Sequence, residues 1–220
     1  MHPTARQNAE WFFAAYAAGR TELAIAEIGS QDVNGSLRDS SPPGARYVGL
    51  DFIPGKGVDL VLTDPYALPL PSESQDIVVS SSCFEHSQMF WLVFLEILRI
   101  LKSNGVFYIN APSNGPFHRY PVDCWRFYPD AAEALAAWGR RSGYQVVLLE
   151  SYTTGQSGGC FNDFVAIYLK DEQQISKHPT RVLDRLNSFT NGRAYGDSVL
   201  RNHQVFPEDQ RRLGEVGLLK

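Results

Sequence analysis

The feature that most constrains the fold is the stretch 24–36, AIAEIGSQDVNGS, in which a short apolar run leads into a glycine turn. Residues 24–28 are expected to form a buried parallel strand, because apolar runs of this length bounded by turn residues are typical of such strands. Gly29 permits a sharp turn, and Asn34 or Ser36 is a suitable N-cap for a following helix. This order favours an open α/β sheet, in which ligands bind at the carboxyl ends of the strands.

Further apolar runs follow at the distances that such a sheet requires. Residues 46–51, RYVGLD, predict a second strand that ends in Asp51, about twenty residues beyond the turn, where a carboxylate reaches a ribose diol. More strands are expected at 58–62, 76–81, 105–111, 144–150 and 161–170, the last two joined by the glycine-rich 155–159. Helices are expected at 5–18, after the first turn, at 86–102 and at 131–142.

The segment 96–109, EILRILKSNGVFYI, runs from a helix through a Leu-Lys pair and a glycine turn into a strand. With this segment and the two strands that end in acids, residues 24–170 resemble the class I S-adenosylmethionine-dependent methyltransferases, in particular the small-molecule, methyltransferase type 11-like branch. The resemblance implies a Rossmann-like α/β fold with a seven-stranded, mostly parallel sheet of order 3-2-1-4-5-7-6. Its last strand is antiparallel, and helices cover both faces.

The resemblance also implies where S-adenosylmethionine binds, at the ends of the first four strands. Asp51 is expected to accept the ribose hydroxyls through charge-assisted hydrogen bonds, which are the stronger kind. Glu27 is expected either to face the amino-acid end of the cofactor or to pair with a neighbouring donor. The usual E-x-G-x-G-x-G turn is altered here, since Gln31 and Val33 replace two glycines. The predicted cofactor site comprises Glu27, Gly29, Ser30, Asp51, Phe52, Asp64, Pro65, Tyr66 and Ser81.

A loop of nearly twenty residues, 112–130, follows the fifth strand and is dense in aromatic and charged groups. Loops of this length inside a compact domain are usually functional, and the resemblance places the acceptor pocket here. The arginines suit a planar or anionic acceptor, or they pin the loop to the domain through Asp123 and Asp130. His86 and His118 are the candidate catalytic bases, because a histidine titrates near neutral pH. The predicted acceptor site comprises Arg119, Tyr120, Asp123, Trp125 and Arg126.

The composition of the chain excludes some classes of binding partner and favours one cellular compartment. The chain has 220 residues, with 20 basic and 24 acidic side chains, and a net charge of -4 gives no electrostatic basis for nucleic-acid binding. Three widely separated cysteines indicate neither a disulfide framework nor a metal site, and five histidines without ligand spacing indicate no metal. The sequence shows no signal peptide or membrane span, so we expect a soluble, cytoplasmic protein, with a homodimer left open.

We therefore predict a methyltransferase domain over residues 1–170, including an N-terminal helix, and a polar C-terminal extension over 171–220 in which 179–188 is a candidate helix. The predicted function is S-adenosylmethionine-dependent O- or N-methylation of a small-molecule acceptor. Two alternatives stay open, namely a non-catalytic binding or scaffold protein with the same fold, and a nucleotide-dependent oxidoreductase. The oxidoreductase lacks its glycine fingerprint in this sequence.

Overall fold

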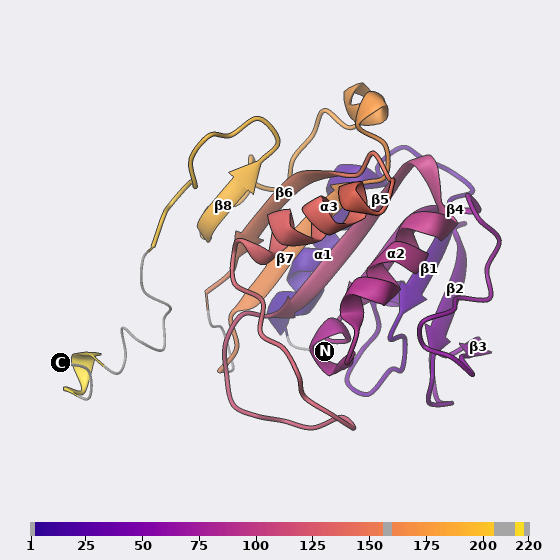
Figure 1. Cartoon of the computed structure of the whole chain (residues 1–220), viewed down its shortest axis with the longest axis horizontal. Coiled ribbons are helices and arrows are strands. Elements are labelled where there is room, and N and C mark those ends of the chain that lie inside the picture. Colours follow the sequence, from indigo (N-terminus) through magenta and orange to yellow (C-terminus); the bar gives the residue numbers. More distant parts are fainter. Residues whose placement is uncertain (1–2, 156–159, 205–213, 218–220) are drawn as a thin grey trace.

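A computed structural model of the chain describes residues 3–155, 160–204 and 214–217. The predicted connection 155–159 and the predicted extension 171–220 thus lie partly outside the described residues. Within the described part, eight strands form one sheet of order β3-β2-β1-β4-β5-β7-β6-β8 (Figure 1). The strands are β1 (Ala24–Ile28), β2 (Arg46–Asp51), β3 (Leu60–Val61), β4 (Gln75–Ser81), β5 (Leu101–Pro112), β6 (Val147–Thr153), β7 (Asp163–Leu169) and β8 (Thr190–Ala194).

Strands β1 to β5 pair in parallel, and β7 runs antiparallel to both β5 and β6. The predicted order 3-2-1-4-5-7-6 is therefore confirmed. The predicted number of strands is too small, because β8 pairs antiparallel with the far side of β6. Its sequence, TNGRA, contains neither an apolar run nor a β-branched cluster, so a pattern search does not identify it as a strand.

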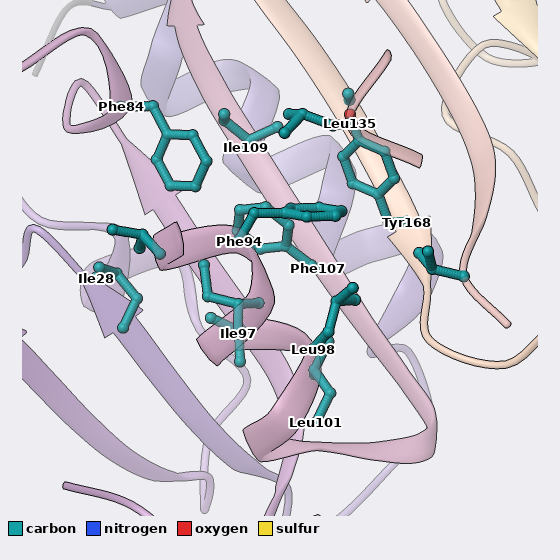
Figure 2. Packing of buried hydrophobic residues seen from close by; sticks show 14 of the residues in the cluster. Ile28, Phe84, Phe94, Ile97, Leu98, Leu101, Phe107, Ile109, Leu135 and Tyr168 are labelled. Atoms are coloured by element: carbon teal, nitrogen blue, oxygen red, sulfur yellow. The ribbon is translucent and has the colours of Figure 1, made fainter. Parts of the chain in front are cut away.

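Helices cover both faces of the sheet, as predicted. Helices α2 (Phe90–Ile100) and α3 (Ala131–Arg141) lie on the near face in Figure 1, and α1 (Pro3–Tyr16) lies behind the sheet. Each face has its own apolar core. On the near face, Phe94 of α2 packs edge-on against Tyr168 of β7, with ring centroids 5.1 Å apart, and Phe107 of β5 stacks on the same tyrosine (Figure 2).

The helix predicted after the first turn is wrong. In the fully described segment between β1 and β2, the regular element is a 3-10 helix of four residues, Leu37–Ser40, and Ser36 caps it by accepting from the Arg38 amide. The proline pair that follows at 42–43 lacks amide donors and stops further helix formation. The turn after β1 therefore leads into loop rather than into the N-terminus of an α-helix.

Other element boundaries differ from the predictions. The helix predicted over 86–102 begins only at Phe90, after a 3-10 helix at Phe84–His86. The candidate helix at 179–188 is wrong, since these residues form turns, and the preceding Glu172–Lys177 is a 3-10 helix. None of the described helices is both long and apolar enough to cross a lipid bilayer.

The segment after β7 is tied to the sheet through one buried carboxylate. Glu150 of β6 is fully buried and accepts hydrogen bonds from the hydroxyl of Tyr16 in α1 and from the amides of Val182 and Leu183, both at 2.8 Å. Burial raises the pKa of Glu150. Val182 and Leu183 also enter the apolar core on the α1 face, so this part of the predicted extension packs as part of the domain.

Candidate functional site

A cavity of about 540 Å³ opens where β1, β2 and β4 end. Its volume lies in the range of small-molecule sites, and its position is the one where ligands bind in open α/β sheets. The walls come from the turns after these strands and from residues 118–122 of the loop between β5 and α3, which we call the 113–130 loop. The cavity thus joins the predicted cofactor region to the predicted acceptor region.

The turn after β1 brings the backbone unusually close to the segment after β4. Gly29 has a φ of +80°, and a Cβ at this position would lie 2.5 Å from the Cβ of Cys83. Only glycine satisfies both conditions. Burial raises the pKa of the Cys83 thiol to about 12, so it packs as a neutral side chain and is not an activated nucleophile.

Asp51 lies at the end of β2 on the cavity wall and is 8% exposed. One carboxylate oxygen accepts from the Gln31 amide and the other from the Ile53 amide, each at 3.1 Å. A carboxylate has about four acceptor positions, so two remain for a ligand. The two backbone amides hold the group in place and leave it able to bind a pair of hydroxyls.

Glu27 lines the cavity from β1 and is 4% exposed. The hydroxyl of Tyr47 donates to its Oε2 at 2.8 Å. Burial raises the pKa of Glu27 to about 7, and the Tyr47 hydrogen bond and the charge of Arg38 oppose that rise. Glu27 thus pairs with a neighbouring donor, one of its two expected arrangements, and it also lines the cavity. Its contact with the amino-acid end of the cofactor stays a prediction.

Most of the other predicted cofactor residues reach the cavity, and two do not. The residues that line it are Phe52, Pro65, Tyr66 and Ser81. The side chain of Ser30 turns inward against Gly49 of β2, away from the lining. Asp64 is exposed and accepts from the Tyr66 amide at 2.8 Å, so it shapes the turn that carries Tyr66 rather than the cavity wall.

Glu85, His86 and His118 lie close together, and all three line the cavity. His86 Nε2 lies 3.7 Å from Glu85 Oε1, and the two imidazole rings stand edge to face with centroids 5.0 Å apart. Burial lowers the pKa of His86 and raises that of Glu85 to about 8. His86 and His118 are far apart in the sequence, so a search for metal ligands at short spacings does not find this cluster. The sequence signal for Glu85 is its position next to His86, which was predicted.

Two of the predicted acceptor residues, Arg119 and Tyr120, also line the cavity. The hydroxyl of Tyr120 donates to the Gln31 side-chain oxygen at 2.8 Å, which joins the 113–130 loop to the turn after β1. Sequence reasoning noted Gln31 only as a replaced glycine. Gln31 follows Gly29 by two positions, and this place at the end of a strand is the sequence feature that indicates a cavity residue.

The remaining predicted acceptor residues lie outside the cavity lining and hold the loop. Arg126 forms a two-pronged ion pair with Asp123, at 2.6 and 2.8 Å, and donates to the Pro116 carbonyl. The Arg126 guanidinium lowers the pKa of Asp123 to about 2. Trp125 donates to the Ser87 carbonyl at 2.8 Å. Asp123 and Arg126 thus hold the loop to itself, and Trp125 ties it to Ser87. Among the described residues, Asp130 pairs with Arg193 and not with a loop arginine, so pinning to the domain through Asp123 and Asp130 is not what the structure has.

Comparisons with known proteins were made for sequence and for structure. The family model of a methyltransferase domain matches residues 34–109. No curated protein matches the sequence. Among solved structures, the 1,6-didemethyltoxoflavin-N1-methyltransferase of Burkholderia thailandensis, with bound 1,6-didemethyltoxoflavin and S-adenosylhomocysteine, superposes with a TM-score of 0.60 at 15% identity, over 76% of this chain and 79% of that chain.

The chain has the fold of the S-adenosylmethionine-dependent methyltransferases. A protein of Galdieria sulphuraria assigned as a sarcosine dimethylglycine methyltransferase superposes with a TM-score of 0.58 at 14% identity, over 77% of this chain and 86% of that chain. The cyclase SpnF gives a TM-score of 0.55 at 12% identity, over 76% and 81% of the two chains. The family match and the fold confirm the predicted resemblance to the class I methyltransferases, enzymes whose cofactor is S-adenosylmethionine.

Proposed function

We propose that the protein transfers a methyl group from S-adenosylmethionine to the oxygen or nitrogen of a small-molecule acceptor. The observation that carries the proposal is the Asp51 carboxylate, which is held by two backbone amides beside the Gly29 turn and faces the cavity with two acceptor positions free. This is the arrangement that binding of a ribose diol requires.

The residues around the turn fit the rest of the cofactor. Glu27, when ionised, pairs with the ammonium of the methionine moiety, and Gly29 lets the backbone approach it. Phe52 and Tyr66 offer flat apolar surface to the adenine ring. S-adenosylmethionine supplies a methyl on a positively charged sulfur, so transfer breaks the sulfur–carbon bond, forms a carbon–oxygen or carbon–nitrogen bond and frees one acceptor proton.

The acceptor lies at the end of the cavity formed by His86, His118 and Arg119. In this proposal one of the two imidazoles receives the proton that the acceptor loses, and Arg119 pairs with an anionic or planar group of the acceptor. The cavity of about 540 Å³, whose wall includes the hydrogen-bonded Tyr120 and Gln31, favours a small molecule. Much of the rate comes from aligning the acceptor with the methyl and excluding water.

The second candidate is a binding or scaffold protein that keeps the fold without turnover. Gln31 and Val33 in place of two glycines favour it, because both side chains enter the cavity lining where the usual turn has none. A fold also serves more than one chemistry, as the superposition on a cyclase illustrates.

The experiment that separates these candidates incubates the purified chain with methyl-labelled S-adenosylmethionine and fractionated small metabolites. If the chain transfers methyl groups, one metabolite fraction gains labelled mass when it is incubated with wild type. The same fraction should gain much less with Asp51→Asn. Binding of S-adenosylmethionine by calorimetry without any labelled product supports the scaffold protein. A chain that binds neither S-adenosylmethionine nor S-adenosylhomocysteine contradicts methyl transfer and also supports the scaffold protein.

A further inference from the structure

The acceptor end of the cavity holds a cluster of possible metal-ligand atoms, which come from Glu85 and from the two histidines that the proposed function treats as candidate bases. Glu85, His86 and His118 each offer one atom, and these atoms all lie within 4.8 Å of one another. We propose that these three residues bind a divalent first-row transition-metal ion, with Zn²⁺ as the reference case. The inference rests on the proposed function only in placing the ion next to the acceptor.

Both histidines have the hydrogen-bonding pattern of metal ligands. Nδ1 of His86 bonds to the Val122 carbonyl, and Nδ1 of His118 lies 3.2 Å from the Pro116 carbonyl. A carbonyl oxygen only accepts, so each Nδ1 carries the proton and each Nε2 keeps a lone pair. Metal-binding histidines almost always donate their other ring N–H to a carbonyl or carboxylate in this way.

The third ligand is a buried carboxylate with an unsatisfied oxygen. Glu85 is 1% exposed, and its Oε2 has no hydrogen-bond partner among the described residues. Leaving the oxygen of a buried carboxyl group without a hydrogen-bond partner is costly. Burial is the main cause that raises the pKa of Glu85; the charge of Arg126 opposes the rise, and those of Asp123 and Asp163 add to it. A bound cation offsets the charge of these acids and satisfies the free oxygen.

The nearest positive charge does not prevent cation binding. Arg126 Nη2 lies 3.4 Å from His118 Nδ1, but both of its terminal nitrogens are paired with the Asp123 carboxylate. The ion pair offsets part of the charge of Arg126, which still acts on Glu85 and His86. It holds the guanidinium on the Nδ1 side of His118.

The donor set selects the class of ion. Two imidazoles and one carboxylate with positions left open form the ligand set of catalytic zinc sites, whereas Mg²⁺ and Ca²⁺ prefer oxygen ligands. Ligands on one zinc ion, at bond lengths of about 2.1 Å, lie roughly 3.4 Å apart, so atoms that lie up to 4.8 Å apart must approach by up to about 1.4 Å. His118 has a side chain that is 39% exposed and lies on the 113–130 loop, which makes it the residue that moves.

An ion here changes how the acceptor loses its proton. An imidazole whose Nε2 binds a metal ion is not a base, so the ion would replace the histidines in that role by lowering the pKa of an acceptor hydroxyl. The proposed function sets the acceptor against the same two histidines, so an ion held by them would lie beside the acceptor.

The test is calorimetric titration of the full chain with Zn²⁺, and with Mg²⁺ in parallel, in a Cys124→Ser/Cys160→Ser background that removes the two exposed thiols. A second readout is the visible absorption of Co²⁺, which reports nitrogen and oxygen ligation directly. The variants are His118→Ala and Glu85→Gln, with His203→Ala as the matched control, because His203 is exposed and lies outside the cavity lining. Binding of S-adenosylhomocysteine is measured separately in the presence of a chelator.

We expect one Zn²⁺ per chain, much weaker binding of Mg²⁺, and a loss of Zn²⁺ affinity of at least about 100-fold in His118→Ala and Glu85→Gln, since each removes one of three ligands. His203→Ala should bind as the parent does. If Glu85→Gln fails to fold, His118→Ala decides, because its side chain is partly exposed on a loop. A folded parent that binds no Zn²⁺, or binding that both variants retain, overturns the metal site. Binding of S-adenosylhomocysteine with chelator present leaves the proposed function standing in either case.

Discussion

Tyr120 donates its hydroxyl hydrogen to Oε1 of Gln31 at 2.8 Å, and this bond links two segments that are 89 positions apart in the chain. It connects the 113–130 loop to the turn after β1, and both residues line the cavity. Gln31, at the position of a family glycine, thus anchors a loop that forms part of the cavity wall.

Tyr120→Phe removes this anchor and keeps the ring. A neutral hydrogen bond contributes about 0.5–1.5 kcal/mol, so we expect S-adenosylhomocysteine to bind about 3- to 10-fold more weakly, as the loop closes less often. The free energy of unfolding should change little, because Tyr120 is half exposed. Calorimetry and urea unfolding measure the two quantities. Unchanged affinity in Tyr120→Phe would show that the loop closes without Gln31.

The pH dependence of cofactor binding depends on Glu27. Burial raises its pKa to about 7, while Tyr47 and Arg38 favour the charged form and Asp32 opposes it. Only the ionised carboxylate pairs with the ammonium of S-adenosylmethionine. The ionised fraction rises from about one-tenth at pH 6 to about three-quarters at pH 7.5, so the affinity should rise about 8-fold over that interval.

The matched control for this pH effect is Glu27→Gln, which keeps an acceptor for Tyr47 and has no charge to titrate. Its affinity for S-adenosylmethionine should be lower and flat over the same pH range when followed by calorimetry. A wild-type affinity that is constant from pH 6 to 7.5 would argue against contact between Glu27 and the ammonium.

Glu150→Ala tests how the segment after β7 is held. The change leaves the Tyr16 hydroxyl and the amides of Val182 and Leu183 buried without an acceptor. We expect the free energy of unfolding to fall by about 3–5 kcal/mol in urea titrations, the range for removing one partner from a buried charged network. Glu133→Ala is the control, since its ion pairs are exposed and should contribute at most about 1 kcal/mol. Equal unfolding midpoints for the two variants would contradict this role of Glu150.

Much of the sheet is predictable from the sequence because its parallel strands are buried on both faces. Such strands read as continuous apolar runs, as in residues 24–28 and 76–81, and the acid at position 51 marks the end of one of them. The 3-10 helix at Leu37–Ser40 and strand β8 were missed for opposite reasons. A good capping residue predicts an α-helix after the first turn, but the prolines at 42–43 end the helix after four residues. Strand β8 has a polar sequence, and it pairs because β6 offers an open edge.

Site residues at the ends of strands could be predicted from the sequence. Site residues on the 113–130 loop could not be told from their neighbours. Asp51, Glu27 and Gly29 reach the cavity because strand ends share one edge of the sheet. Within the 113–130 loop, the sequence alone does not tell Arg119, which lines the cavity, from Arg126, which pairs with Asp123. The division at residue 170, the cytoplasmic location and the homodimer stay predictions.

The most direct test of the account is the affinity of S-adenosylmethionine for wild type, Asp51→Asn and Asp64→Asn, measured by calorimetry at pH 7.5. Both variants change an acid near a strand end, but only Asp51 faces the cavity. Loss of the charge should weaken two charge-assisted hydrogen bonds, so we predict a drop of about 100-fold for Asp51→Asn, or about 2.7 kcal/mol, and less than about 3-fold for Asp64→Asn. Equal affinities for wild type and Asp51→Asn would contradict the claim that this carboxylate holds the ribose.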